Sequence, residues 1–144
     1  MKKFQFTLQK LYDVKVSEEK QMRTQLRELE QNLDNYIRQK QANRNLYDRE
    51  HAIYQEKSKT GMSMFEVQRY GDFFQYLEKE MRQQENVIQA CRHSIEQCRA
   101  ALVKLINEQQ VLDRMREDQY AEYKKEAAKE EDKVLEDFLQ ARVS

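Results

Sequence analysis

The sequence predicts an all-α fold in which two long helices form an antiparallel coiled-coil hairpin with a C-terminal helix overhang. Three observations support this fold class. The 144 residues include no proline and only two glycines, although Gly and Pro supply most of the turn residues that sheets and loop-rich folds need. Charged residues make up 36% of the chain and hydrophobic residues 39%, a balance that suits helices with one narrow apolar seam. The apolar residues also recur in alternating steps of three and four, the spacing of a coiled coil.

The first helix is expected over residues 5–57, where the pattern of threes and fours runs without a phase correction. Most of its seam positions are apolar or aromatic, but Lys40, Asn43 and Glu50 interrupt the pattern near the turn. Polar seam residues lower the stability of a coiled coil and can fix its register. We therefore expect the half of the hairpin next to the turn to be the looser one.

A turn is expected at residues 58–63, followed by a second helix over residues 64–139. The segment that starts at Ser63 is a capping box, in which the Ser63 hydroxyl accepts a hydrogen bond from the amide of Glu66. Gly71 lies inside the second helix and lowers its stability by up to ~1 kcal/mol. The local sequence therefore predicts a sharp helix start directly after the turn.

A short connection makes two helices antiparallel. Folding about Gly61 places residue i roughly opposite residue 121 minus i, so that Leu33 is expected to face Ile88 and Tyr47 to face Phe74. The whole chain, residues 1–144, is expected to form one such hairpin. The predicted seam comprises Leu26, Leu29, Leu33, Ile88, Cys91, Ile95, Cys98 and Leu102. The two cysteines are interpreted as small hydrophobic seam residues, with a cross-chain disulfide or a metal site as the alternative.

The second helix is longer than the first, so residues from about 118 onward are expected to lack a partner within the chain. Residues 113–133 are almost wholly polar and charged. A short apolar stripe at helical spacing follows, formed by Val134, Leu135, Phe138 and Leu139. Such a stripe needs a surface to pack on, and the sequence leaves open a loosely folded tail, self-association or a helix that docks on a partner.

The residues near the turn carry more apolar groups than a two-helix seam can bury. This excess predicts an exposed patch that a partner could cover, although a broadened core remains the alternative. The candidate residues of the patch are Leu46, Tyr47, Tyr70, Phe73 and Leu77.

Several functional classes are disfavoured by the sequence. The net charge is zero, whereas a nucleic-acid-binding surface usually shows a basic excess. No apolar run is long enough to span a membrane, and the N-terminus has no apolar region typical of a secretory signal. His51 and His93 stand apart from any ligand cluster, and no catalytic motif is present. We therefore expect a protein without enzymatic activity, catalytic residues, cofactor or metal.

Short motifs in three places resemble one protein family. The segment Phe4–Leu11 is similar to the start of the FliJ family of bacterial flagellar export proteins. The turn Lys59–Ser63 resembles the turn of that family. Tyr70, Phe73 and Leu77 are similar to the beginning of its second helix.

This resemblance implies a component of the flagellar type III export apparatus, located in the cytoplasm and peripherally at the cytoplasmic face of the membrane. FliJ proteins are similar in shape to the central stalk of rotary ATPases. The resemblance implies that the chain binds the export ATPase FliI and the export-gate protein FlhA and assists export chaperones. A general coiled-coil scaffold and a stalk or chaperone of virulence type III secretion are the alternatives.

The resemblance also implies two groups of contact residues. The end that carries both termini would enter the ATPase ring, with Phe4, Phe6, Leu8, Leu135, Phe138 and Leu139 as contacts. The gate would contact the end with the turn, at Leu46, Tyr47, Tyr70, Phe73 and Leu77. Glu50 departs from the family pattern, because an aromatic residue is expected at that position.

Overall fold

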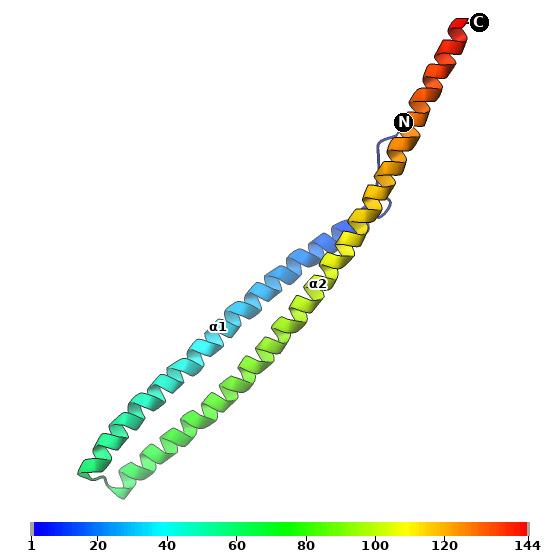
Figure 1. Ribbon diagram of the computed structural model, residues 1–144. Coiled ribbons are helices and arrows are strands. Elements are labelled where there is room, and N and C mark those ends of the chain that lie inside the picture. The colour runs from blue at the N-terminus through cyan, green and yellow to red at the C-terminus, as the bar shows by residue number, and fades with distance from the viewer. Residues whose placement is uncertain (1, 144) are drawn as a thin grey trace. The chain divides into compact units, whose positions relative to one another are not determined.

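The computed structural model describes residues 2–143 and confirms the predicted fold class. It contains two helices, α1 (Gln9–Thr60) and α2 (Met64–Val143), and no strand among the described residues. α1 lies antiparallel along α2, as Figure 1 shows. The contacts group into two compact units. The tip unit comprises Thr24–Ala100 and includes the turn, and the terminal unit joins the residues up to Arg23 with those from Ala101 onward. The expectation of a single domain stays a prediction.

The turn between the helices is shorter than the sequence indicates, because α1 continues to Thr60. The hydroxyl of Thr60 donates a hydrogen bond at 3.1 Å to the carbonyl of Lys57, one of the last four carbonyls of the helix, which lack an intrahelical donor. The Ser58 hydroxyl donates a further bond to the Gln55 carbonyl at 2.8 Å. Gly61 then ends α1 with a φ of 99°, in the left-handed region that favours glycine.

The start of α2 agrees with the capping box in the sequence. The Ser63 hydroxyl accepts a hydrogen bond from the Glu66 amide at 3.2 Å, and the Ser63 carbonyl accepts one from the Val67 amide at 3.1 Å. α2 runs on to Val143 rather than ending at residue 139. No proline or glycine occurs in its last turns to stop it.

At the Lys40–Glu85 contact, the hairpin differs from the predicted register by four residues, slightly more than one helical turn. Lys40 lies opposite Glu85, with 2.6 Å between the ammonium nitrogen and a carboxylate oxygen, whereas the sequence rule places it opposite residue 81. The physical reason is the extension of α1 to Thr60, which moves the midpoint of the turn from Gly61 towards Met62. The long side chains of Tyr47 and Phe74 reach each other despite this shift in register, and their ring centroids lie 5.0 Å apart, as expected.

The seam of each unit is buried mainly on the α2 side. None of the α1 residues is buried, whereas α2 contributes most of the buried apolar side chains. The predicted positions Leu26, Leu29 and Leu33 on α1 are half-buried, as is Cys98 on α2. Cys91 and Cys98 are not joined in a disulfide, and the buried Cys91 thiol donates to the Leu29 carbonyl at 3.4 Å. The buried α2 seam residues are Leu77, Met81, Ile88, Cys91 and Ile95 in the tip unit and Leu102, Leu105 and Leu112 in the terminal unit.

Polar residues that interrupt the seam bond to one another across it. In the tip unit, the Asn43 amide donates to the Gln84 side-chain oxygen at 3.1 Å, next to the Lys40–Glu85 ion pair. In the terminal unit, Lys15 and Glu108 form an ion pair at 2.7 Å. Because a shift of either helix by one turn would separate these partners, they favour the observed register.

We expect truncation of Ile88 to alanine to lower the free energy of unfolding by about 2–5 kcal/mol, because the buried side chain leaves a cavity in the seam. Ile88 is 2% exposed, whereas the neighbouring Val87 is 45% exposed. Val87→Ala is therefore the matched control, with an expected change within about 0.5 kcal/mol. Urea unfolding followed by circular dichroism measures both, and equal losses would contradict the observed seam.

The fold should lose stability in acid because its interhelical ion pairs titrate. Lys40 holds the pKa of Glu85 below the ordinary value of 4.5, and Lys15 does the same for Glu108. A carboxyl with a lowered folded-state pKa stabilises the fold above its unfolded pKa, and this stabilisation is lost as the pH falls through the folded pKa. We expect the melting temperature to fall from pH 4.5 downward, and to fall less in a Glu85→Gln, Glu108→Gln variant. An equal acid dependence of variant and parent would assign the loss to other groups.

Candidate partner-binding surfaces

The first residues of the terminal unit form an extended strap on α2 instead of the helical start that the sequence predicts at residue 5. We call residues 2–8 the N-terminal strap. Phe6 is 7% exposed, and the Phe4 ring contacts Tyr120 edge-on with centroids 5.1 Å apart and Tyr123 at 5.5 Å. Alternate residues of an extended chain point to the same side, so Phe4 and Phe6 can anchor the strap together. In a helix the two rings would diverge by about 200°, which explains why an extended strap replaces the predicted helix.

Side chains of α2 bond to the backbone and hydroxyl of the strap. The Tyr123 hydroxyl donates to the Lys2 carbonyl at 2.8 Å. The Gln119 amide nitrogen donates to the Thr7 hydroxyl at 3.0 Å, and its oxygen accepts from the Thr7 backbone amide at 3.3 Å. The expectation that α2 lacks a partner from about residue 118 is therefore wrong for Gln119, Tyr120 and Tyr123. Two tyrosines in an otherwise charged stretch were the only signal of this contact in the sequence.

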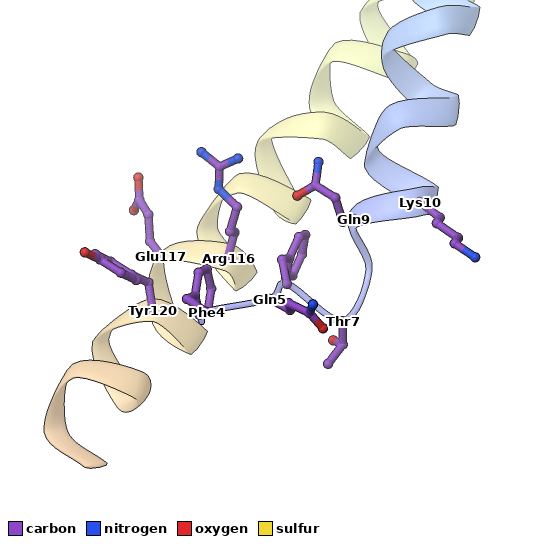
Figure 2. Close-up of a pocket in the computed structure, with 9 residues that line it drawn as sticks. Phe4, Gln5, Thr7, Gln9, Lys10, Arg116, Glu117 and Tyr120 are labelled. Carbon is purple, nitrogen blue, oxygen red and sulfur yellow. The ribbon is translucent and has the colours of Figure 1, made fainter. Parts of the chain in front are cut away.

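Open hollows flank the strap on α2. One of about 940 Å³ is lined by Phe4, Lys10, Arg116 and Tyr120 among others, as Figure 2 shows. A second of about 590 Å³ lies beside Lys2, Gln119 and Tyr123. Their walls combine aromatic rings with amide and charged groups of both signs, which suits protein contacts more than catalysis.

Past the strap, α2 continues as a solvated helix with an apolar stripe. All side chains of residues 124–143 are exposed except the half-buried Ala127. Ion pairs three residues apart, such as Lys129–Glu126 at 3.8 Å, line its surface. We call the four apolar residues the tail stripe, and they are 50–68% exposed: Val134, Leu135, Phe138 and Leu139.

The tip unit contains a cluster of aromatic rings that mostly pack on one another. Tyr47 stacks on His51 with centroids 5.9 Å apart and planes 7° from parallel. Tyr54 contacts Tyr70 at 5.4 Å and Phe74 at 5.9 Å. Burial raises the pKa of the Tyr47 hydroxyl, as does its hydrogen bond to Glu78. The aromatic excess near the turn therefore serves in part as a broadened core.

The predicted gate contacts differ in their accessibility. Leu77 is 2% exposed and belongs to the seam, so its side chain cannot form the surface contact that the resemblance implies. Tyr70, Phe73, Leu46 and Tyr47 are half-buried. Exposed apolar residues in the first turns of α2 include Met64, Phe65 and Tyr76.

A hollow of about 510 Å³ opens beside these aromatic residues. It is lined by Glu50, Lys57, Tyr70 and Phe73 among others. The Lys57 ammonium lies 5.5 Å from the centre of the Tyr70 ring, and hydrogen bonding to the Tyr70 side chain raises the pKa of Lys57. Glu50 stands where the family pattern has an aromatic residue, and its carboxyl group makes one wall of the hollow polar.

The predicted contacts at the terminal end also fall into two groups. Phe4 is half-buried and Phe6 buried in the strap, and Leu8 is half-buried at the junction with α1. Leu135, Phe138 and Leu139 are exposed on the tail stripe. Only the second group presents free apolar surface.

Two searches over the described residues were negative. Residues 2–143 contain no group of three or more His, Cys, Asp or Glu residues placed to hold a metal ion. Neither helix in this part of the chain has an apolar segment of the length needed to cross a membrane.

Comparison with protein families identifies one match, to the model described as Flagellar FliJ protein, over residues 4–144. No curated protein and no solved structure gives a significant match. The family match spans essentially the whole chain and agrees with the resemblance of its turn and N-terminal motifs. The chain therefore belongs to the FliJ family and is a component of the flagellar export apparatus.

Proposed function

We propose that this FliJ-family chain is a non-enzymatic, stalk-like coiled coil that links the export ATPase FliI to the export gate FlhA. It would act in the cytoplasm, peripherally at the membrane, and assist the delivery of chaperones and substrates during flagellum assembly. The observation that supports this proposal most is the presence of separate exposed apolar surfaces in the two units, the tail stripe and the aromatic surface at the turn. Two distinct surfaces allow one chain to contact two partners.

The ATPase contact is assigned to the terminal unit. Charged helices without a packing face are marginal in water, so the end of α2 gains stability when the tail stripe is covered. Burial of a large apolar side chain contributes about 1.5–3 kcal/mol. Leu135, Phe138 and Leu139 are the accessible members of the predicted ATPase contacts.

The gate contact is assigned to the tip unit. Phe73 and Tyr70 line the hollow beside Lys57, and Tyr76 is 59% exposed. Aromatic residues that are partly exposed on a supporting core are typical of interface centres. Leu77 acts from the seam by holding this part of α2 in place.

Replacement of Leu135 and Phe138 by alanine should weaken ATPase binding at least tenfold, because two exposed apolar anchors are removed. The melting temperature should stay nearly constant, since these side chains are exposed in the free chain. The matched control removes two exposed valines of the same unit, Val103→Ala and Val111→Ala. Binding measured by isothermal titration calorimetry checks this, and absence of binding by the parent chain at micromolar concentration would favour a general scaffold.

Replacement of Phe73 and Tyr76 by alanine should weaken binding to the cytoplasmic part of the gate protein at least tenfold, with helicity retained. Leu77→Ala should instead lower the melting temperature, because Leu77 is buried. Val87→Ala, at an exposed position of the same unit, is the binding control. Unchanged gate affinity of the Phe73, Tyr76 variant in surface plasmon resonance would refute this placement of the gate contact.

A further inference from the structure

We infer that the N-terminal strap is a releasable cover that must leave α2 before a partner protein can enclose the helix around Gln119–Tyr123. The strap would then compete with the partner from within the same chain. The identity of the partner rests on the proposed function, whereas the release of the strap does not.

The strap is held by few anchors for its length. Lys2, Lys3, Gln5 and Thr7 are exposed, and Phe6 is the one strap residue that is buried. Each ordered residue loses conformational entropy, while only the two phenylalanines supply substantial apolar contact. Segments with few buried contacts open locally without unfolding of the whole protein. The strap meets this condition.

The junction between the strap and α1 offers little resistance to release. The Leu8 carbonyl accepts the first helical bond, from the Tyr12 amide at 3.0 Å, so Leu8 occupies the N-cap position without a side-chain acceptor. The first turn of α1 contains no acidic residue, and Lys10 adds positive charge near the positive end of the helix dipole. The start of α2 shows the contrast, because Ser63 caps it.

The hollows on the two flanks of the strap allow it to lift without displacing other elements. The larger one is lined by residues of the strap such as Phe4 and Thr7 and by Lys10 and Arg116, which Figure 2 shows. Water can therefore reach both sides of the strap. Release must break the ring contacts of Phe4 with Tyr120 and Tyr123 and the hydrogen bonds to Gln119 and Tyr123, and it must expose the buried Phe6 side chain.

Release would extend the apolar face of the tail stripe. Tyr120, Ala127 and Val134 follow one another at steps of seven, so they lie on nearly the same side of α2. Tyr120 is already 44% exposed and Tyr123 is half-buried. Removal of the strap frees the remaining area of both rings, so that the continuous face extends about 21 Å from Val134. The two tyrosine rings stack at 6.3 Å and offer apolar faces with hydroxyl groups, which are common in protein interfaces. The fitting partner is a protein that surrounds the end of α2 with an apolar surface.

This inference reverses the role that the resemblance gives to Phe4 and Phe6. As partner contacts, they would strengthen binding, and their removal would weaken it. As anchors of a cover, they hold the chain in a closed state, and their removal would strengthen binding. The sign of the change in affinity distinguishes the two roles.

The first test measures binding of the export ATPase to the full-length chain and to a Phe4→Ala, Phe6→Ala variant. We expect the variant to bind at least threefold more tightly, because a state populated for a fraction of the time reduces the apparent affinity by that fraction. A Lys3→Ala, Gln5→Ala variant alters two exposed strap residues and should bind like the parent. Weaker binding of the phenylalanine variant would overturn the inference.

The second test needs no partner. The chain lacks tryptophan, so Phe4→Trp introduces a single tryptophan, at the strap, whose emission can be followed apart from that of the tyrosines. We expect its emission to change at a lower urea concentration than the loss of helicity, and Phe6→Ala to shift this first transition to still lower urea. Coincident transitions would make the strap an integral part of the fold and overturn the inference. If no variant binds the ATPase, the proposed function fails, and the urea transitions alone decide whether the strap is releasable.

Discussion

The packing of α1 on α2 is the interaction on which the rest of the structure depends. Helices of this composition gain most of their stability from tertiary packing rather than from intrinsic propensity, and α1 has no buried residue of its own. Its apolar side chains stabilise the fold only where they pack over α2 residues such as Ile88 and Leu102. The tail stripe and the rings near the start of α2 are parts of α2 that α1 leaves uncovered.

The polar seam residues show how the hairpin combines stability with a defined register. Leucine at Lys40, Asn43 and their α2 partners would bury more apolar surface but would tolerate a shift by one turn. The Asn43–Gln84 hydrogen bond and the Lys40–Glu85 ion pair are satisfied in one register only. The register also determines which aromatic residues gather around Tyr47 and Phe74.

Much of this fold was predictable because helical periodicity and capping are local. The pattern of threes and fours matches the half-buried and buried positions on both helices, and Ser63 starts α2 as its motif indicates. The strap was not predictable, because two phenylalanines in seven residues fit a helix or an extended chain equally well until their partners on α2 are known. Leu77 illustrates a conflict between two signals. The seam pattern includes it and the resemblance makes it a surface contact, and the structure supports the seam pattern.

The strap, like α1, covers apolar side chains of α2 that would otherwise be exposed to water. Tyr120 and Tyr123 give α2 two further aromatic rings beyond the stretch that α1 covers, because α1 begins only at Gln9. An extended segment spans about 3.3 Å per residue against 1.5 Å for a helix, so a few residues suffice to reach both tyrosines. Only Phe6 of the strap is buried, so the strap contributes less apolar contact than the seam between α1 and α2. A partner that supplies a complete apolar surface can therefore replace the strap at the end of α2 while the α1–α2 seam stays intact.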